Sequence, residues 1–336
     1  MDISAIILVK KKKIQFKKIR VPELKKGQLL VKIKYTSICH TQIQEIDGVR
    51  GKDNFLPHCL GHEATGLVIK KNNSVKKFKV NDKVCLSWVP SEGFNAGGTT
   101  YFDKIGKKIN AGPVNTFSNY SVVSENKLQK LNKYSDMKKS VLLGCALPTA
   151  YNCIFSNVAH PKKKNILIIG CGGVGLSIVH ASKIAQFSKI SIIEKDSKKI
   201  KTAFKLGSSQ VLTNKDFKSY FDYFDYVIEC TGNDEMLNFS IKFVKKFGGS
   251  LIIVGNYKHK TKFKIDPWQI LYGKKVIGSW NKTFNYRKKF KKFEKFSKKL
   301  NSNLIFGKKI YSLKNFSSAM NDFKKGKVIR PLIKVG

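Results

Sequence analysis

A glycine-rich turn between an apolar strand and a helix constrains the fold of this chain more than any other feature. The run Ile166–Ile169 is continuously apolar, Gly170–Gly175 reads G-x-G-G-x-G, and Leu176–Ala185 has the pattern of a helix. Such a turn sets the amides of a helix N-terminus where they can hold a pyrophosphate, and its glycines let the backbone approach closely. The segment therefore predicts the first unit of a dinucleotide-binding fold. The glycines expected at the phosphates are Gly170, Gly172, Gly173 and Gly175.

Strands and helices alternate over the residues that follow this turn. Short apolar runs at Ile190–Ile193, Tyr226–Ile228 and Ser250–Val254 are separated by helical segments, the first of which ends near Gly207. Strands alternating with helices at this spacing form a parallel sheet with helices on both faces. We therefore expect an α/β fold with a Rossmann doubly wound parallel sheet in this part of the chain.

An acidic residue, Glu194, stands at the end of the second of these strands. It follows the turn by some twenty residues, the separation at which a carboxylate can accept both hydroxyls of the adenosine ribose. The same carboxylate would repel a 2′-phosphate, so the sequence favours NAD. The neighbouring Lys195 and Lys199 could offset that repulsion, so NADP remains an alternative.

The first half of the chain has a different pattern. Short runs such as Leu29–Ile33, Gly66–Ile69 and Lys83–Leu86 are divided by Gly, Asn and Pro turns, which predicts a β-rich domain. Its glycine content makes Ser91–Pro113 look like a loop. Further on, Arg287–Lys299 carries phenylalanines at helical spacing among many lysines, which predicts an amphipathic helix with a basic face.

The chain is strongly basic, with a formal net charge of +43. Such a charge would suit a polyanion-binding protein. Specific recognition of bases and phosphates relies on arginine, however, and here the only arginines are Arg20, Arg50, Arg287 and Arg330. The lysines are spread along the whole length beside many Ile, Asn and Phe residues, whose codons are rich in A and T. We attribute the charge to genome composition and expect no specific nucleic-acid partner, with polyanion binding as the alternative.

The cysteines and the apolar runs bear on the compartment. Seven cysteines are an odd number without a paired framework, which predicts free thiols in a reducing environment. The first residues have an apolar run followed by lysines, the reverse of the order in a signal peptide. No apolar stretch approaches the roughly twenty residues that span a membrane. We therefore expect a cytoplasmic protein with no membrane partner.

Three short blocks carry a resemblance to a known family. They are Cys39-His40-Thr41, Gly61-His62-Glu63 and Leu143–Thr149. Their order and spacing resemble those of the zinc-dependent medium-chain alcohol dehydrogenases, and with the glycine turn the resemblance covers essentially the full length. It implies a β-rich GroES-like catalytic domain beside the Rossmann domain, one catalytic zinc and a nicotinamide cofactor.

The resemblance also assigns roles around the metal. Cys39, His62 and Cys145 would be the zinc ligands, and three protein ligands leave a fourth position open for chemistry. Glu63 would lie close to the metal on its inner side. Thr41 would bond the alcohol oxygen and begin proton removal. Zinc beside a bound nicotinamide would then drive hydride transfer between an alcohol or aldehyde and NAD.

Further residues are assigned to the cofactor and the substrate in the same way. His40 and Arg330 would contact the pyrophosphate, and Val174 and Thr149 would pack against the nicotinamide ring. Lys199 completes the cofactor-binding set. The positions implied for the substrate pocket are Trp88, Phe117 and Asn256.

Three positions depart from the family pattern. Many relatives bind a second, structural zinc through four closely spaced cysteines, but Trp88–Gly93 contains none, so we expect no structural zinc. Gln42 stands where relatives usually have an aspartate that accepts the other N–H of the zinc histidine; its amide oxygen could replace that bond but not the charge. Gln44 replaces a relay histidine, so the proton must leave by water or the cofactor ribose. The segment Gly97–Val123 still resembles the glutathione-dependent formaldehyde dehydrogenases.

These observations predict three segments. Residues 1–148 would form the GroES-like catalytic domain, residues 149–281 the NAD-binding Rossmann domain, and residues 282–336 a return to the catalytic domain. We expect a zinc- and NAD-dependent alcohol dehydrogenase that acts on a small alcohol or aldehyde and forms a dimer or tetramer. The alternative within the superfamily is a zinc-free quinone or enoyl reductase, which the retention of all three ligands disfavours.

Overall fold

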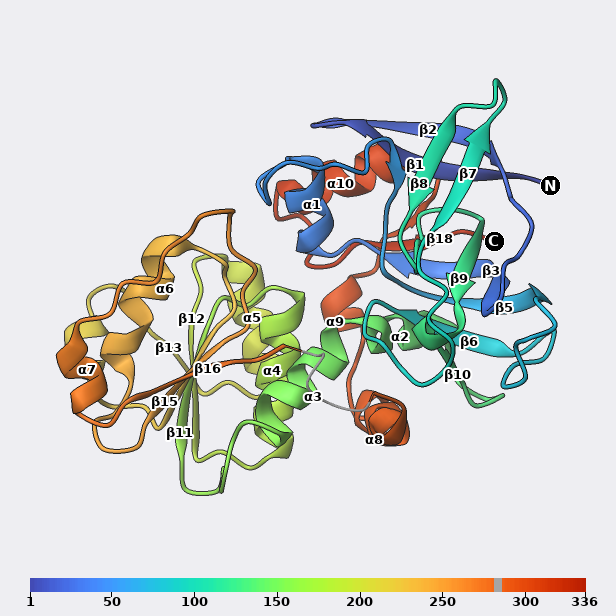
Figure 1. Ribbon diagram of the computed structural model, residues 1–336. Coiled ribbons are helices and arrows are strands. Elements are labelled where there is room, and N and C mark those ends of the chain that lie inside the picture. Colours follow the sequence, from blue (N-terminus) through green and yellow to red (C-terminus); the bar gives the residue numbers. More distant parts are fainter. Residues whose placement is uncertain (281–285) are drawn as a thin grey trace. The chain divides into compact units, whose positions relative to one another are not determined.

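The structure divides into two compact units. The computed structural model describes residues 1–280 and 286–336. Unit 1 contains Met1–Cys145 together with the described residues after position 285, and unit 2 contains the described residues from Ala146 up to position 280 (Figure 1). The predicted boundary between residues 148 and 149 falls within helix α3 (Ala146–Phe155), and the boundary between 281 and 282 lies outside the described residues. The three-segment division stays a prediction.

Unit 1 is built from a closed barrel and a second sheet. Its strands are β1 (Asp2–Lys10), β2 (Lys13–Arg20), β3 (Gln28–Ser37), β4 (His58–Cys59), β5 (Glu63–Lys71), β6 (Lys83–Ser87), β7 (Thr99–Asp103), β8 (Lys108–Ala111), β9 (Tyr120–Ser124), β10 (Leu128–Lys130), β17 (Ile310–Ser312) and β18 (Leu332–Lys334). The barrel has the order β1-β2-β7-β8-β4, and the sheet has the order β10-β6-β5-β3-β18-β17, with β9 also paired to β3. β18 comes from far along the chain and pairs antiparallel with β3, which completes the unit.

The first strand shows why these residues form a doubly packed β unit. Ile3, Ala5 and Ile7 belong to one core cluster, and Ile6 and Leu8 belong to another. Successive side chains of a strand point to opposite faces, so a strand buried on both sides needs a continuous apolar run. The β-rich character predicted for this part of the chain is confirmed.

The hairpin β7–β8 corrects one expectation. The sequence predicts a loop over Ser91–Pro113, and this prediction is wrong, because the segment contains an antiparallel pair that closes the barrel onto β2 and β4. Tyr101 and Ile109 fill the barrel core. The glycines lie before, between and after the two strands, so they mark turns around strands rather than an extended loop.

Unit 2 is a six-stranded sheet in which every neighbouring pair is parallel. Its strands are β11 (Asn165–Ile169), β12 (Lys189–Ile193), β13 (Gln210–Val211), β14 (Tyr226–Glu229), β15 (Ser250–Ile253) and β16 (Lys275–Gly278). In the order β13-β12-β11-β14-β15-β16, the strands that follow β11 along the chain are first added on one side of it and, from β14 on, on the other. The switch point therefore lies between β11 and β14. Doubly wound sheets bind their ligand outside the carboxyl ends of the strands at such a switch point. The predicted Rossmann sheet is confirmed.

The helices connect these strands. They are α1 (His40–Ile46), α2 (Met137–Ser140), α3, α4 (Gly173–Ile184), α5 (Ser197–Leu206), α6 (Asp234–Ser240), α7 (Pro267–Leu271), α8 (Tyr286–Lys298), α9 (Asn303–Phe306) and α10 (Phe316–Lys324). α8 confirms the predicted amphipathic helix, since Phe290, Phe293 and Phe296 are buried while its lysines face outward. None of the described helices is both long and apolar enough to cross a membrane.

Candidate metal centre and nucleotide site

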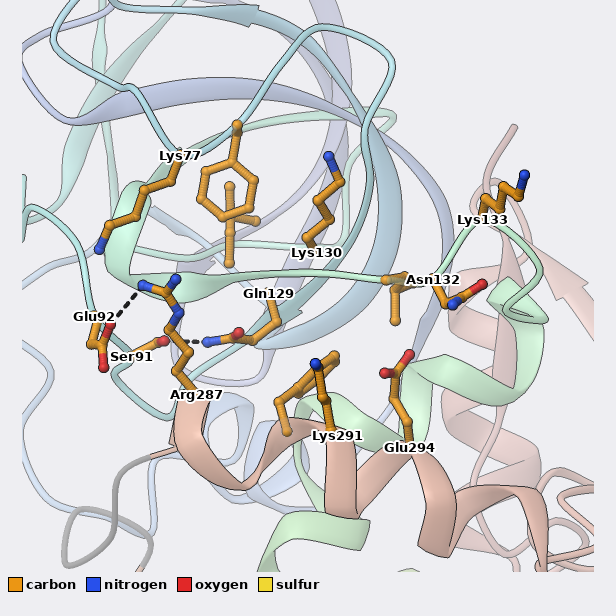
Figure 2. Close-up of a pocket in the computed structure, with 14 residues that line it drawn as sticks. Lys77, Ser91, Glu92, Gln129, Lys130, Asn132, Lys133, Arg287, Lys291 and Glu294 are labelled. Carbon is orange, nitrogen blue, oxygen red and sulfur yellow. Dashed lines mark hydrogen bonds and ion pairs between the residues drawn. The ribbon is translucent and has the colours of Figure 1, made fainter.

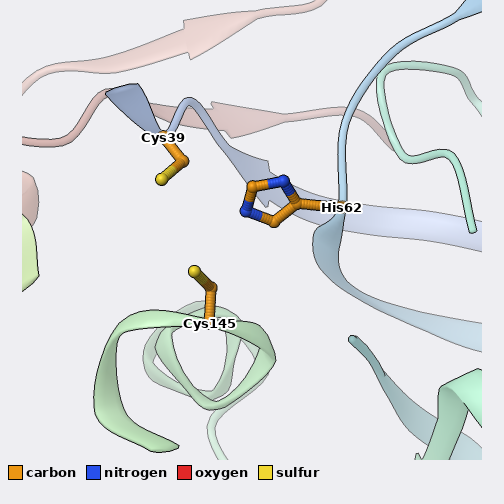
Figure 3. Close-up of side chains that lie close together, drawn as sticks. All are labelled: Cys39, His62 and Cys145. Atoms are coloured by element: carbon orange, nitrogen blue, oxygen red, sulfur yellow. The ribbon is translucent and has the colours of Figure 1, made fainter. Parts of the chain in front are cut away.

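Three side chains from distant parts of unit 1 converge on one point. Cys39 lies between β3 and α1, His62 precedes β5, and Cys145 follows the short 3₁₀ helix Val141–Gly144. Their ligand atoms, two Sγ and one imidazole nitrogen, all lie within 4.8 Å of one another. Figure 3 shows the three side chains pointing toward a common space. These are the residues that the resemblance assigns to zinc.

Two glycines allow the ligands to come this close. Gly61, beside the imidazole ligand, has a φ of +94°, and a Cβ there would overlap the Thr116 hydroxyl. A Cβ on Gly144, beside the last thiol ligand, would lie 2.5 Å from the Leu86 carbonyl oxygen. Positive φ and close backbone approach both favour glycine. A side chain at either position would therefore displace a metal ligand.

The two cysteines of this group are hydrogen-bonded to each other, and their pKa values move in opposite directions. The hydrogen bond from Cys145 holds the pKa of Cys39 well below its usual value, and the positive charge of Arg330 acts in the same direction. The same hydrogen bond raises the pKa of Cys145 well above its usual value. The site therefore already stabilises one thiolate, the protonation state in which sulfur binds a metal ion.

His62 is oriented by Gln42 on α1. The Gln42 amide nitrogen lies 2.6 Å from His62 Nδ1, and the amide oxygen accepts the Cys39 backbone N–H at 3.3 Å. The sequence predicts the opposite orientation, with the amide oxygen toward the imidazole. An amide nitrogen in this place can only donate, which requires Nδ1 to be without a proton. A ligating Nε2 must be bare, so metal binding through it requires the amide to turn and accept from Nδ1.

The charge of Cys39 also acts on the imidazole. Burial alone would lower the pKa of His62, but the hydrogen bond and negative charge of Cys39 outweigh burial and raise the pKa. A cation is therefore stabilised at this point of unit 1. A divalent metal ion would replace that proton and satisfy the same negative potential.

A buried ion pair lies beside the metal ligands. Glu63 is fully buried, and its Oε1 accepts from Arg330 Nε at 2.9 Å, from Arg330 Nη2 at 2.5 Å and from the Ser37 hydroxyl. Burial raises the pKa of Glu63, and the guanidinium opposes that rise. The resemblance assigns Arg330 to the pyrophosphate. The structure shows a further contact that sequence reasoning missed, because Glu63 and Arg330 are too far apart in sequence for any local pattern to reveal the pair.

The other predicted residues of unit 1 lie in varied surroundings. Thr41 Oγ1 is 3.7 Å from Cys39 Sγ, so its hydroxyl borders the metal group. His40 is exposed, with its ring edge-on to a phenylalanine of α10. Trp88 is half-buried, whereas Phe117 is buried in the core against another phenylalanine of α10.

The glycine turn of unit 2 has the close contacts that its sequence predicts. Gly170 has a φ of +91°, and a Cβ there would lie 2.7 Å from Thr231 Cγ2. A Cβ on Gly175 would overlap the Gly170 carbonyl oxygen, so α4 can approach β11 only with glycine at this position. Gly172 faces open space, which leaves its backbone accessible to a ligand.

Glu194 follows β12 and bonds back to this turn. Its Oε2 accepts the Cys171 N–H at 2.9 Å, and its Oε1 accepts the Lys195 N–H at 2.8 Å. Lys199 lies in the first turn of α5, where its N–H bonds the capping carboxylate. The remaining predicted residues of unit 2 are half-buried: Thr149 on α3, Val174 on α4 and Asn256 after β15.

Sequence reasoning missed a buried carboxylate in unit 2. Glu229 ends β14 with no exposed surface and bonds to Thr231 and Tyr257. An acidic residue that closes an apolar strand at the edge where ligands bind is the signal that could have found it.

A separate groove lies in unit 1 between α8 and β10 (Figure 2). Its volume is about 510 Å³, and its lining carries both charges, including Glu294. Arg287 is paired with Glu92 at 2.6 Å, and Lys130 is paired with Asp82 at 2.6 Å. Two of the cations that line this groove are therefore paired with carboxylates.

The donor set of the metal group fits zinc. Two thiolates and one imidazole match the soft and borderline ligands that zinc prefers, and three protein ligands leave one coordination position for water or substrate. Within the described ranges, this is the one group of three such residues whose ligand atoms come so close together. Cys39, His62 and Cys145 would hold the ion.

Family models match both units. The model of the alcohol dehydrogenase GroES-like domain matches residues 25–133, and the model of the zinc-binding dehydrogenase matches residues 173–299. The matched ranges contain the first two metal ligands and most of the Rossmann sheet.

Relatives and solved structures agree with these models. S-(hydroxymethyl)glutathione dehydrogenase of Synechocystis sp. is 25% identical over 80% of this chain and 81% of that protein. Alcohol dehydrogenase class-3 of Caenorhabditis elegans is 26% identical over 82% and 83%. The structure of benzyl alcohol dehydrogenase from Acinetobacter calcoaceticus has the same fold, with a TM-score of 0.88, 22% identity and full coverage of both chains. The chain belongs to the zinc-containing medium-chain alcohol dehydrogenase family.

Proposed function

We propose that this chain interconverts an alcohol and its aldehyde with NAD as hydride carrier and one zinc ion per chain. The observation that carries the proposal is the convergence of Cys39, His62 and Cys145 in a chain whose other unit has a complete nucleotide turn at its switch point. When bound, zinc supplies a Lewis acid that lowers the pKa of an alcohol, and nicotinamide supplies the hydride acceptor. The alcohol gives a hydride to NAD and a proton to solvent.

The residues of α1 would carry the proton. The Thr41 hydroxyl borders the metal group, where it can accept a hydrogen bond from the alcohol and pass the proton on. Gln44, one turn further along α1, cannot titrate. The proton would then leave through water or the cofactor ribose. Trp88, Phe117 and Asn256 are proposed to shape the substrate pocket.

The cofactor preference would be set by Glu194. Its two oxygens already accept backbone N–H groups of the turn and of its own loop, which fixes the carboxylate beside the ribose position. A fixed negative charge favours the two ribose hydroxyls of NAD over the 2′-phosphate of NADP. His40, Arg330 and Lys199 would add positive charge toward the pyrophosphate and ribose.

The proposal of a single zinc is supported by the distribution of cysteines. Trp88–Gly93, where a structural-zinc cluster would lie, contains no cysteine. Five cysteines lie outside the metal group, and burial raises the pKa of each of them: Cys59, Cys85, Cys153, Cys171 and Cys230. Cysteines of this kind serve as small apolar side chains. Free thiols throughout also favour a reducing compartment such as the cytoplasm.

The two rival functions are less well supported. A zinc-free reductase has no use for a buried group of two thiols and an imidazole, which is costly to keep without a metal. Specific phosphate recognition relies on arginine, whereas Arg287, the arginine that lines the groove at α8, is paired with Glu92. We therefore propose no nucleic-acid partner.

We also propose that unit 2 binds a second copy of the chain at β16. This strand ends the order of the described sheet, and apolar side chains stand exposed on and beside it. Leu271 is 70% exposed, Trp268 60% and Val276 37%. An exposed apolar edge of this kind is typical of a self-association surface.

The activity test uses zinc-loaded protein with a panel of alcohols and aldehydes and both nicotinamide cofactors. The panel should include benzyl alcohol, 2,3-butanediol and S-(hydroxymethyl)glutathione. We expect NAD reduction with at least one alcohol and loss of turnover when a chelator removes the metal. Turnover of quinones or enones that survives metal removal would establish the reductase instead.

A further inference from the structure

A buried carboxylate stands at the switch point of unit 2. Glu229 is the last residue of β14, and its register partner on β11 is Ile169, the residue before the glycine turn. The ligand crevice of a doubly wound sheet opens outside this end of these two strands. Glu229 therefore lies where a dinucleotide would cross from one half of the sheet to the other.

Four donors hold the two oxygens of this carboxylate. Oε1 accepts the Thr231 N–H at 2.7 Å and the Thr231 hydroxyl, and Oε2 accepts the Tyr257 hydroxyl and, at 3.4 Å, the Gly232 N–H. Thr231 Oγ1 itself accepts the Asn233 N–H at 2.9 Å, so its own proton is directed to Glu229. Burial and the neighbouring carboxylate raise the pKa of Tyr257, so the phenol stays a donor.

The loops that follow β14 and β15 are pressed together around Glu229. A Cβ on Gly255 would lie 2.5 Å from Glu229 Oε2, and a Cβ on Gly232 would overlap the Asn256 carbonyl oxygen. No side chain fits between the two loops at these positions. Thr231 lies in the loop after β14 and Tyr257 in the loop after β15. The Glu229 carboxylate links the two loops because it accepts hydrogen bonds from both residues.

We propose that Glu229 and Tyr257 are positioning residues for the nicotinamide half of the cofactor, an inference that rests on the proposed function. Glu229 is fully buried, so it is placed to act through other residues. It acts through the loop that carries Thr231 and the loop that carries Asn256, which together form the wall of the crevice beyond the switch point. The adenosine half belongs to the other side of β11, where Glu194 lies.

The test is Tyr257→Phe, which removes one donor to Glu229 and keeps the ring. We expect the Kd for NADH to rise about tenfold, because the loop that carries Tyr257 and Asn256 is held less firmly at the crevice, and kcat with an alcohol to fall as well. The Kd for AMP, which fills the adenosine half alone, should stay unchanged. Tyr226→Phe is the matched control, because that hydroxyl bonds Ala159 at the opposite end of the same strand. It should leave both constants unchanged.

Other outcomes would overturn the inference. If Tyr257→Phe binds NADH as the parent does, or loses NADH and AMP affinity equally, the contact between Glu229 and Tyr257 has no role specific to the nicotinamide half. Should the variant unfold, Thr231→Val removes the hydroxyl from the other carboxylate oxygen and must show the same selective loss, with urea midpoints measured for both. A parent that binds neither NADH nor NADPH would instead overturn the proposed function, and with it this inference.

Discussion

The pKa of Cys39 lies well below its usual value and that of Cys145 well above it, because the two thiols are hydrogen-bonded and Arg330 stands near the first of them. A metal ion would remove this asymmetry by taking both sulfurs as thiolates. The ligand atoms of the metal group, all within 4.8 Å of one another, are therefore arranged for a cation.

Cys39→Ala should abolish turnover and zinc binding while the protein stays folded. Elemental analysis should find about one zinc per parent chain and well under that in the variant. Cys59→Ala is the matched control, since that thiol is equally buried but lies in the barrel core. The control should keep its zinc and lose about 1 kcal/mol of stability through the small cavity it creates. Global unfolding of Cys39→Ala would show that the site is structural, and two tightly held zinc ions in the parent would contradict the single zinc.

Gln42→Asp should move the alkaline-side rise of the pH–rate profile to higher pH. The amide lies 2.6 Å from His62 Nδ1, and a carboxylate there would add negative charge to a site that would hold two thiolates once zinc is bound. A more negative ligand set makes zinc a weaker Lewis acid, so the ionisation that limits turnover needs a higher pH. The shift could reach about one pKa unit, or about 1.4 kcal/mol. A profile that overlays the parent with zinc fully bound would reduce Gln42 to a packing residue.

Glu194→Ser should weaken NAD binding and raise the ratio of NADP to NAD efficiency. The change removes the charge that would repel a 2′-phosphate and the acceptor for the ribose hydroxyls. Initial rates with both cofactors, measured at the same alcohol concentration, give the ratio. An unchanged ratio would place the discrimination elsewhere, with Lys195 and Lys199 as the next residues to replace.

At the scale of elements, the connection between α7 and β16 depends on a buried lysine. The Lys274 side chain has no exposed surface, and its Nζ lies 2.5 Å from Asp222 Oδ1, 2.6 Å from Gln269 Oε1 and 3.1 Å from the Ile241 carbonyl oxygen. One ammonium group thus ties three separate segments of unit 2 together. Removing it leaves three acceptors without that donor.

Lys274→Met should lower the free energy of unfolding by about 2 kcal/mol, because a buried charged hydrogen-bonding group is lost. Lys246→Met is the control: Lys246 also pairs with Asp222, at 3.2 Å, but is exposed and should cost under about 1 kcal/mol. Urea denaturation of both variants measures the difference. If both variants lose the same free energy of unfolding, burial of the Lys274 ammonium group does not contribute to stability.

The same lysine sets an acid dependence of stability. Burial would raise the pKa of Asp222, but the bonds from Lys274 and Lys246 outweigh it and lower the pKa. The resulting stabilisation is complete above the ordinary aspartate pKa of about 3.9 and is lost as pH falls through the lowered value. Lys274→Met should therefore flatten the stability curve below about pH 4. If stability falls with pH below about pH 4 in the variant as it does in the parent, Lys274 does not set the pKa of Asp222.

Elements with strong local patterns could be predicted from the sequence, and elements fixed by distant partners could not. β11 follows from a continuous apolar run, and the turn after it from its glycines. α8 follows from phenylalanines at helical spacing. The hairpin β7–β8 is short and polar on one side, and it forms because β2 and β4 pair with its edges. No local pattern contains that information.

The candidate site divides in the same way. The three metal ligands were predicted, since their blocks are recognisable in order. The Glu63–Arg330 pair and the Glu229–Tyr257 contact were not, because each joins residues from separate loops or strands. The contact of the Gln42 oxygen with the Cys39 backbone was not predicted either, since no local pattern shows it. The acceptor role of that oxygen toward a zinc-bound His62 stays a prediction.

At the scale of the whole molecule, the exposed edge at β16 predicts an oligomer. Leu271→Lys combined with Val276→Lys should convert a dimer or larger assembly of the parent into monomers, because charges replace apolar contacts. Light scattering at moderate salt, where the repulsion from the net charge of +43 is screened, gives the mass. Val80→Lys, at a residue 51% exposed in unit 1, is the control and should not change it. A monomeric parent would show that the exposed edge at β16 is not a self-association surface.

The pairing of Glu63 with Arg330 also has a consequence for how the protein is made. The two residues are 267 positions apart, and all of unit 2 is encoded between them. At about 5 to 20 residues per second, a ribosome needs on the order of 10 to 50 seconds to travel that distance. Throughout that interval the Glu63 carboxylate has no guanidinium, and β3 lacks its partner β18. The nascent chain can therefore finish unit 2 before Glu63 gains Arg330 and β3 gains β18, even though all three metal ligands are synthesised earlier.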